Sequence, residues 1–397
     1  MEVGKEKMRI AVVHGLLRGG AARRLFGTVE ALNEMPDVVL KEFAFTDAVT
    51  LVPTNTWSTD WAPDAPARPR LVRPLWRYLD VAGMRSTWAH LWAEVNAWNP
   101  DVVFANPCAN PGGAPPGLRG SRVPSVYYCD EPRRVDYEKD AARASNPLTR
   151  LPYAPMRRLF RADERASVRA AGALATNSAY TAGRIAEAYG REATVVTPGI
   201  APIFGPGPQL TRRHVLSVGT LIPSKGHDLV VQAVAESGLE RPVVLVGPRH
   251  EADEERRLHA LADRLGVPLS IEVGISDERL ADLYREAVVT MYLARDEPLG
   301  LVSLEAQACG TPVIVAAEGG LVETVDHGVG GLHVPRTAHG AADGLRRLME
   351  PGELERLAAG AAARVIPRDL DSAHALLALV AQVTATTPEP VPTRAEA

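Results

Sequence analysis

The sequence predicts an α/β protein of two doubly wound domains, each built on a parallel sheet with helices on both faces. Short, continuously apolar runs alternate with amphipathic stretches along the chain, as is typical of strands buried on both faces of a parallel sheet. A segment rich in Pro and Gly interrupts this pattern near residue 200. The length of 397 residues also exceeds what a single core usually supports.

The first half contains six short β-branched runs, and the stretches between them carry apolar residues at helical spacing. The predicted strands are 9–13, 38–45, 101–105, 123–128, 173–176 and 193–196, and the predicted helices lie near 20–34, 83–98, 156–171 and 178–190. The second half repeats this rhythm, with predicted strands at 214–218, 242–246, 268–273, 288–292 and 312–316 and helices between them.

The segment between the halves, residues 198–211, holds four prolines and three glycines, which predicts a hinge. We therefore expect a Rossmann-like domain at 1–200, a second at 201–370, and a cleft between them. Residues 371–397 are expected to form a C-terminal helix that can cross back to the first domain, followed by a disordered tail from about residue 384.

Composition excludes several classes of protein. A hydrophobic fraction of 46% is incompatible with wholesale disorder, and no apolar stretch approaches the ~18–20 residues of a membrane span. The start of the chain lacks the pattern of a signal peptide. A formal net charge of −4 argues against a nucleic-acid partner. The three cysteines, Cys108, Cys129 and Cys309, form no CxxC, which favours the reduced cytoplasm.

The six tryptophans all lie between residues 57 and 98. Trp88, Trp92 and Trp98 share a predicted helix and are expected to pack in the core. Trp57 and Trp61 lie in a Pro-rich loop. Rings in such a loop can stack on an acceptor or simply anchor the loop, and both interpretations stay open.

The strongest local motif is Glu297-Pro-Leu-Gly-Leu-Val-Ser-Leu-Glu305, between a predicted strand and a helix at about 301–309. The turn leaves the amides of Gly300, Leu301 and Val302 free at the positive end of the helix dipole, which predicts an anion site. Glu305, one turn into the helix, can accept hydrogen bonds from a ribose diol, and Glu297 can reach a second hydroxylated group. The alternative is a helix N-terminus with an incidental acid.

A second motif is VGTLIPSKGHD, residues 218–228, where a predicted strand ends at Gly219 and Lys225 precedes the next helix. Only five of the 44 basic residues are lysines, and Lys225 is the only one after residue 139. We expect its ammonium group beside the same anion site, where it would neutralise a departing diphosphate. A solvated lysine at a helix start is the alternative.

A third motif is the Gly-rich loop after the first predicted strand, in which Gly19 and Gly20 allow a ligand to approach the backbone closely. The loop does not fit GxGxxG, and no GxxxxGK[ST] occurs in the chain, which disfavours a nicotinamide cofactor and nucleotide hydrolysis. The ten histidines show no zinc-binding grouping. The Asp-x-Asp at Asp369 and Asp371 is predicted to cap a late helix.

These motifs resemble those of family 4 glycosyltransferases, which have the two-domain GT-B architecture. The resemblance rests on the E-x7-E pair, the Lys225 loop, Gly19-Gly20, TNSAYTAGRIAEAYGREATVVTPGI (176–200) and ETVDHGVGGLHV (323–334), and it is most convincing over residues 173–335. It implies a retaining transfer of a sugar from a nucleotide-sugar donor, UDP- or GDP-linked, to an acceptor hydroxyl. It also implies that neither a metal nor another cofactor is needed.

The resemblance assigns roles to particular residues. Glu305 would hold the ribose, Glu297 the donor sugar, and Lys225 with the amides of 300–302 the diphosphate. Gly19, Gly20, Gly219 and Thr220 would complete the donor site. With Lys225 and Glu297, Asp130 is the third candidate catalytic residue.

Three positions depart from the family pattern. Thr220 stands where an arginine is usual, and Ala22 replaces the acid of a GGAE sequence. SVYYCDEPRR, residues 125–134, is similar to a YYCHEPPR segment in which a histidine lines the active site, and Asp130 occupies that histidine's position. An aspartate can accept a hydrogen bond from a sugar, stabilise positive charge or act as a base, but it cannot reproduce an imidazole.

These departures leave two alternatives to an active transferase. One is a catalytically weakened protein that binds a nucleotide sugar or a partner, and the other is an epimerase or hydrolase on the same fold. The acceptor, whether a small molecule, a glycan or a lipid-linked glycan, is also open. Arg157, Arg161, Arg165 and Arg169 form a helical stripe that fits lipid phosphates, an anionic acceptor or a solvated face.

Overall fold

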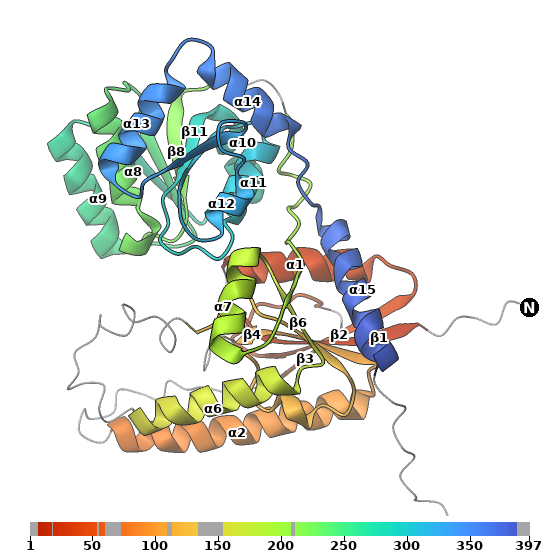
Figure 1. The fold of residues 1–397 in the computed structure, drawn as a ribbon. Helices are drawn as coiled ribbons and strands as arrows, with labels where there is room; N and C mark the ends of the chain where they lie inside the picture. The colour runs from red at the N-terminus through yellow and green to blue at the C-terminus, as the bar shows by residue number, and fades with distance from the viewer. Residues whose placement is uncertain are drawn as a thin grey trace, which may run out of the picture. The chain divides into compact units, whose positions relative to one another are not determined.

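The computed structural model describes residues 7–17, 19–53, 55–59, 73–108, 113–133, 154–207 and 211–386, with the backbone alone at 73–82, 154, 156 and 386. The chain divides into two compact units, each with its own parallel sheet (Figure 1). The first unit contains the described residues of 1–177, 182–197 and 370–386, and the second contains those of 178–181 and 198–369. The predicted pair of parallel sheets is therefore confirmed.

The sheet of the first unit has the strand order β3-β2-β1-β4-β5-β6-β7 among the described residues. Its strands are β1 (Met8–Gly15), β2 (Val38–Phe45), β3 (Thr56–Thr59), β4 (Val102–Cys108), β5 (Ser125–Tyr128), β6 (Ala173–Thr176) and β7 (Thr194–Val195). Its helices are α1 (Gly20–Asn33), α2 (Arg73–Trp98), the 3-10 turn η1 (Leu118–Gly120), α6 (Ala154–Ala170), α7 (Ala179–Tyr189) and α15 (Asp369–Thr386).

Helices cover both faces of this sheet because alternate residues of each strand point to opposite sides. Ile10 and Val12 of β1 pack with α1 and α15, whereas Ala11 and Val13 pack with α2, α6 and α7. Helices α2 and α6 lie side by side (Figure 1), joined by hydrogen bonds from Arg85 to Asp163. The arrangement is doubly wound, as the sequence predicts.

The sheet of the second unit has the order β10-β9-β8-β11-β12-β13. Its strands are β8 (His214–Val218), β9 (Val243–Gly247), β10 (Leu269–Val273), β11 (Ala287–Tyr292), β12 (Val313–Ala316) and β13 (Gly331–Val334). Its helices are the 3-10 turn η3 (Pro223–Lys225), α8 (His227–Ser237), α9 (Ala252–Leu265), α10 (Asp277–Glu286), α11 (Leu301–Ala308), α12 (Leu321–Thr324), α13 (Ala338–Leu348) and α14 (Glu353–Ala363). Helices α8, α9 and α13 lie on one face, and α10, α11 and α14 lie on the other (Figure 1).

The predicted hinge is partly packed. Ile200 and Phe204 are buried in the core of the second unit, and the Phe204 ring meets Tyr284 edge to face at 5.9 Å. Residues 208–210 lie outside the described residues. Only part of 198–211 is therefore a connection, because two of its apolar side chains are used to complete a core.

The C-terminal helix α15 belongs to the first unit, although the chain has left that unit at residue 198. It places Ala373, Leu376, Leu379, Val380 and Val383 in the core beside α1 and β1. Helix α15 runs to Thr386, two residues beyond the predicted start of the tail. The rest of that predicted tail, 387–397, lies outside the described residues.

The tryptophan predictions have three outcomes. Trp88 and Trp92 are buried in the core of the first unit, as predicted, and Trp98 packs against it. Trp57 is not in a loop but in β3, where its ring lies 6.0 Å from that of Phe43. The short edge strand turns this side chain inward, which favours the anchoring interpretation. Trp61 lies outside the described residues.

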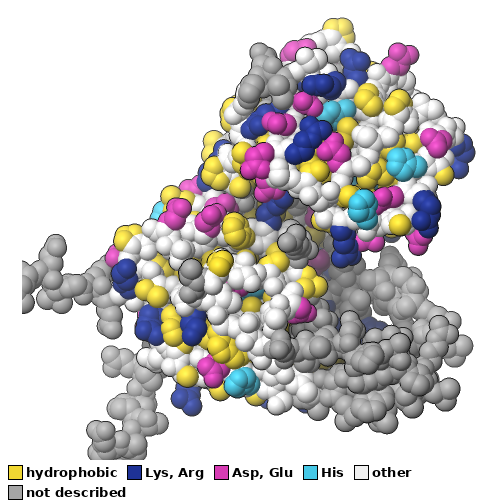
Figure 2. Space-filling model, turned by 180° about the vertical axis from the view of Figure 1, so that it is seen from behind, with side chains coloured by type: hydrophobic (Ala, Val, Ile, Leu, Met, Phe, Trp, Pro, Cys, Tyr) yellow, Lys and Arg dark blue, Asp and Glu magenta, His cyan; other side chains and the backbone are white. Residues whose placement is uncertain are grey.

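Acidic and basic side chains are interspersed over the face of the molecule shown in Figure 2. Several ion pairs in the described residues join neighbours one helical turn apart, as in Arg256–Asp253, Arg257–Glu254 and Arg356–Glu353. Such exposed pairs contribute little to stability but leave no large field of one sign. In the stripe on α6, Arg165 and Arg169 are exposed, whereas Arg157 and Arg161 are half-buried.

Candidate functional site

The second sheet has a topological switch point between β8 and β11. These strands are neighbours, but the chain leaves β8 toward β9 and leaves β11 toward β12, so the loops at their carboxyl ends diverge. Ligands of doubly wound sheets bind at such a point. The loop after β8 carries Gly219, Thr220 and Lys225, and the loop after β11 carries Glu297. The structure thus brings the two strongest sequence motifs to one edge of one sheet.

Lys225 and Glu297 are in direct contact. The Lys225 Nζ donates to Glu297 Oε2 at 2.7 Å and to the Tyr292 hydroxyl at 3.1 Å. The side chains of Lys225 and Glu297 are 23% and 16% exposed, so the pair is partly desolvated yet reachable from solvent. A cation and an acid held together at a strand end can present opposite charges to the two parts of a charged ligand.

The backbone of the β8 loop is fixed by a buried histidine. His227 Nε2 lies 3.3 Å from the carbonyl oxygen of Thr220, and its Nδ1 lies 3.1 Å from Ser217 Oγ. Since a carbonyl only accepts, Nε2 carries the proton and donates to Thr220. Burial lowers the pKa of His227 to about 4. The ring is therefore neutral near pH 7 and serves as an anchor for the loop that holds Gly219 and Lys225.

Helix α11 begins at the end of the second loop. Gly300 caps it with φ +102°, and a Cβ there would come within 2.5 Å of Leu321 Cδ2. The amide of Ser303 donates to the Gly300 carbonyl at 3.0 Å. The amides of Gly300, Leu301 and Val302 belong to the helix start, where N–H groups have no partner within the helix. This geometry is the one that the predicted anion site requires.

Glu305 is far less accessible than Glu297. The residue is 2% exposed, and the Tyr284 hydroxyl donates to its Oε2 at 2.8 Å. The carboxylate is thus oriented by a tyrosine from α10. Its assignment to a ribose stays a prediction.

The sequence analysis missed a third loop of this site, Glu318-Gly319-Gly320 after β12. The amide of Gly320 donates to the Glu297 carbonyl at 2.7 Å, and Glu318 Oε1 accepts from the Asp296 amide at 3.2 Å. A Cβ on Gly320 would lie 2.0 Å from the Pro298 carbonyl oxygen. Only glycine permits this crossing, so the loop clamps Glu297 in place. The paired glycines after an apolar strand were the available signal.

The first unit also has a switch point, between β1 and β4, and Asp130 lies beside it. Its carboxylate faces Arg24 of α1. Arg24 Nε donates to Asp130 Oδ1 at 2.9 Å, and Arg24 Nη2 donates to Oδ2 at 2.8 Å. Both carboxylate oxygens are engaged in a bidentate ion pair, with side chains 2% and 18% exposed for Arg24 and Asp130.

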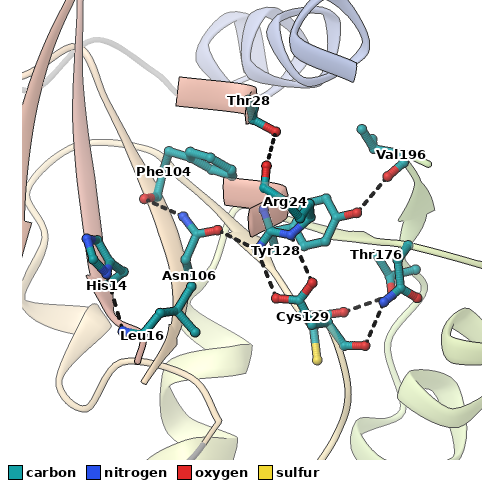
Figure 3. A network of polar contacts seen from close by, with 12 residues as sticks. His14, Leu16, Arg24, Thr28, Phe104, Asn106, Tyr128, Cys129, Thr176 and Val196 are labelled. Atoms are coloured by element: carbon teal, nitrogen blue, oxygen red, sulfur yellow. Dashed lines mark hydrogen bonds and ion pairs between the residues drawn. The ribbon is translucent and has the colours of Figure 1, made fainter. Parts of the chain in front are cut away.

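Further contacts lock this pair. Arg24 Nη2 also donates to Asn106 Oδ1 at 3.0 Å, and the guanidinium carbon lies 3.8 Å from the centre of the Tyr128 ring (Figure 3). Asn177 donates to the Asp130 carbonyl at 2.9 Å. Burial tends to lower the pKa of Arg24, but Asp130, Tyr128 and Tyr127 together outweigh it and the pKa is raised. Sequence reasoning missed Arg24, because 106 positions separate it from Asp130.

Gly19 and Gly20 lie at the start of α1 in the first unit. Both are exposed, and a Cβ on either would meet nothing within 4 Å. Gly19 is extended, with φ 163°, so its conformation does not require glycine. Their assignment to the donor stays a prediction, as do those of Gly219 and Thr220.

The described residues contain neither a metal-binding cluster nor a membrane-spanning helix. No group of three or more His, Cys, Asp or Glu side chains within them is arranged to hold a metal ion. No helix in that part of the chain is long and apolar enough to cross a bilayer. The three cysteines are unpaired and buried, and burial raises the pKa of Cys309 to about 12.

Comparison with known proteins agrees with the fold. Residues 203–364 match the family model "Glycosyl transferases group 1". The chain is 37% identical over 228 residues to the D-inositol 3-phosphate glycosyltransferase of Acidothermus cellulolyticus, with 50% of each protein covered. The protein of the same name from Kribbella flavida is 35% identical over 246 residues, covering 56% of this chain and 55% of that protein. The chain thus spans about half the length of the curated relatives it matches.

Solved structures match almost the whole chain. Sucrose-phosphate synthase from Thermosynechococcus elongatus has a TM-score of 0.72 at 21% identity, covering 96% of this chain and 100% of that one. HepE of Anabaena, solved with UDP and glucose, has a TM-score of 0.68 at 18% identity, with 94% and 99% covered. The glycosyltransferase WaaG has a TM-score of 0.67 at 20% identity, with the same two shares covered. The chain therefore has the GT-B fold, and its second unit carries a glycosyl transferases group 1 domain.

Proposed function

We propose that this protein is a glycosyltransferase that moves a sugar from a nucleotide-sugar donor to an acceptor hydroxyl, with retention of configuration. The observation that carries the proposal is the Lys225–Glu297 pair. It lies at the switch point of the group 1 domain, beside the N-terminus of α11. A cation, a set of free amides and an acid at one strand edge suit a ligand with a diphosphate at one end and hydroxyl groups at the other.

The proposed donor is UDP- or GDP-linked. Lys225 and the amides of Gly300, Leu301 and Val302 would bind the diphosphate, and Glu297 would accept hydrogen bonds from the sugar. Glu305 would do so from the ribose, oriented by Tyr284. Gly219 and Thr220 would border the site from the β8 loop, and Gly19 and Gly20 are the remaining residues proposed to bind the donor.

In the reaction, the bond between the anomeric carbon and the diphosphate oxygen breaks, and the electron pair leaves with the diphosphate. Lys225 and the helix amides stabilise that developing charge, a contribution that is worth about 10²–10³ in rate per donor in comparable sites. The acceptor oxygen then attacks from the face that the nucleotide leaves, and its proton passes to the departing diphosphate oxygen. We propose no covalent enzyme intermediate and no metal ion.

The proposal is tested first by ligand binding. A thermal-shift panel should include UDP, GDP, ADP and their common sugar conjugates, because a ligand that binds only the folded state raises its stability. The melting temperature should rise with one diphosphate and its conjugates and rise much less in Lys225→Ala. The absence of any shift with the whole panel would contradict the proposed donor site.

The second test is product analysis with the donor so identified. The acceptor panel should include D-inositol 3-phosphate, because the relatives from Acidothermus cellulolyticus and Kribbella flavida carry that acceptor in their names. It should also include simple sugars and lipid-linked glycans, with and without vesicles. Transfer with the anomeric configuration of the donor is the expected result, and an inverted product would overturn the proposed stereochemistry.

A nucleotide-sugar-binding protein without transferase activity is the second candidate. It is favoured by the Arg24–Asp130 pair, because a carboxylate with both oxygens paired to one guanidinium is a poor base. That candidate predicts nucleotide binding without transfer to any acceptor and without slow hydrolysis of the donor. Release of a free or epimerised sugar without an acceptor would instead indicate a hydrolase or epimerase.

A further inference from the structure

Arg336 reaches across the edge of the second sheet. It follows β13, yet its Nε donates to the Leu293 carbonyl at 2.8 Å and its Nη2 donates to the Ser224 carbonyl at 3.2 Å. Its Nε also lies 3.9 Å from Glu318 Oε1. Because the strand order is β8-β11-β12-β13, this single guanidinium spans three neighbouring loops from the strand at the edge.

Two of the loops that Arg336 contacts carry Lys225 and Glu297. Ser224 directly precedes Lys225, and its carbonyl also accepts from the Arg295 amide at 2.8 Å. Glu318 accepts from the amide of Asp296, the residue before Glu297. Asp296 has φ +47°, a conformation that a non-glycine residue adopts only when its surroundings enforce it. Arg336 and Glu318 therefore act on the residues immediately before Lys225 and Glu297.

The chemistry of the contact suits a fixed brace. The Arg336 side chain is 13% exposed, and a guanidinium offers several donors in one rigid plane. Two carbonyl oxygens from different loops occupy two of its nitrogens. A lysine has one flexible nitrogen and cannot hold both carbonyls in the same geometry. None of these contacts uses the Lys225 or Glu297 side chain, so both stay available to a ligand.

We propose that Arg336 is a positioning residue that holds the Lys225–Glu297 pair in register with the start of α11. The inference rests on the proposed function, since the pair is taken to act on a nucleotide-sugar donor. Arg336 touches no reacting atom in this scheme. Its effect reaches the donor only through the loops that it joins.

The test compares Arg336→Gln and Arg336→Lys with Arg356→Gln. Arg356 is a matched control, because it also donates to a backbone carbonyl, that of Gly328, and pairs with Glu353. In Arg336→Gln, kcat should fall at least about tenfold, since small misplacements of reacting groups are costly. The donor KM should change less than about threefold. Arg336→Lys should be intermediate, and Arg356→Gln should match the wild type.

A double-mutant cycle with Lys225→Ala separates positioning from a general loss of structure. If Arg336 acts through Lys225, Arg336→Gln should lower kcat much less in the Lys225→Ala background than in the wild type. An equal loss in both backgrounds, or a loss no greater than that of Arg356→Gln, would overturn the proposal.

Hydrogen exchange of the free protein gives a readout that needs no ligand. In Arg336→Gln, the amides of Arg295 and Asp296 should exchange at least about tenfold faster. Their hydrogen-bond acceptors, the Ser224 carbonyl and the Glu318 carboxylate, lose their contacts with the guanidinium. In Arg356→Gln they should exchange as in the wild type. If the wild type binds neither UDP nor GDP, the proposed function fails. Faster exchange would then still support the brace, and unchanged exchange would overturn it.

Discussion

Each of the two sheets has an oppositely charged pair beside its switch point, and the two pairs differ in what surrounds them. Arg24 and Asp130 make two hydrogen bonds to each other, and the guanidinium also meets Asn106 and the Tyr128 ring. Lys225 and Glu297 share one hydrogen bond and stay partly exposed. The groups of the first pair are occupied by contacts within the protein. We expect the groups of the second pair to separate and bind a ligand.

A charged group that lies at a switch point is therefore not necessarily a ligand-binding group. A buried pair costs desolvation energy that only good geometry repays, and such a pair is hard to separate. The Lys225–Glu297 pair should lose less when it opens, because Lys225 is more exposed than Arg24. We therefore expect substitutions in the first unit to change stability and those in the second to change turnover.

The largest expected effect is on the stability of the first unit. Asp130→Asn leaves the Arg24 guanidinium buried without its counter-charge, and breaking such a pair costs about 3–5 kcal/mol. Urea or thermal unfolding measures the loss. Asp163→Asn is the control, since it breaks a more exposed bidentate pair with Arg85 and should cost less than about 1 kcal/mol. Equal stability of the two variants would remove the contrast between the pairs.

The next effect is on catalysis at the second unit. Lys225→Ala should lower kcat/KM about 10²–10³-fold, equivalent to about 3–4 kcal/mol of transition-state stabilisation. Its stability should change by less than about 1 kcal/mol, because the pair is partly exposed. Steady-state kinetics with the identified donor and acceptor check this, with Arg256→Ala on α9 as an exposed-cation control. Turnover near the wild-type level in Lys225→Ala would overturn its catalytic role.

A smaller effect concerns pH and the loop after β8. His227 has a folded-state pKa of about 4, below its usual 6.5 because of burial. The unfolded chain therefore binds a proton that the folded one does not, and stability falls as pH decreases below about 6.5. The expected loss from this group is about 2 kcal/mol between pH 7.5 and pH 5.

Unfolding curves of the wild type and His227→Gln at both pH values isolate the contribution of His227 to the pH dependence of the free energy of unfolding. The variant should lack the pH-dependent part, whatever the loss of its contacts to Ser217 and Thr220 costs at pH 7.5. If the difference between wild type and variant is the same at both pH values, His227 is not the anchor whose neutral ring fixes the Lys225 loop.

The smallest expected effect comes from the tyrosine that orients Glu305. Tyr284→Phe removes one hydrogen bond to a buried carboxylate and should cost about 1.5 kcal/mol of stability. Tyr189→Phe is the matched control, since Tyr189 donates to Glu164 in the first unit at 2.8 Å. Calorimetry with UDP and GDP should show weaker binding in Tyr284→Phe only. Equal affinity in both variants would show that Glu305 does not contribute to nucleotide binding.

The regular elements could be predicted from the sequence because buried parallel strands form uninterrupted apolar runs. The runs at 38–45, 173–176 and 214–218 match β2, β6 and β8 residue for residue. Strands β3 and β13 were missed because neither forms an uninterrupted apolar run, since their sequences are TWST and GLHV. In β13, Gly331 hides the pattern, and it is glycine because a Cβ would lie 2.1 Å from the Val313 carbonyl oxygen.

The start of α2 was also predicted too late. The helix begins at Arg73 with Pro74 in its first turn, where a missing amide costs nothing. The predicted start at residue 83 therefore left out ten helical residues.

The candidate site also has parts that could be predicted from the sequence and parts that could not. The Lys225 and Glu297 loops can be predicted from the sequence, because glycine turns and charged residues directly follow apolar runs. The contacts that hold these loops come from Glu318 and Arg336, whose side chains look like ordinary surface charges in the sequence. Likewise, Asp130 could be singled out by its motif, but its partner Arg24 lies far away in the sequence, on helix α1. Long-range pairing of charges leaves no periodic signal, so only the folded chain reveals it.

Helix α15 has a consequence for the order in which the molecule is made. The apolar face that it covers belongs to a unit whose other elements have all been synthesised by residue 197, more than 170 positions earlier. On the ribosome, the second unit therefore emerges whole while the first still lacks one wall of its core. The first unit should mature last, and during that interval its exposed strip of side chains would be a natural binding place for a chaperone.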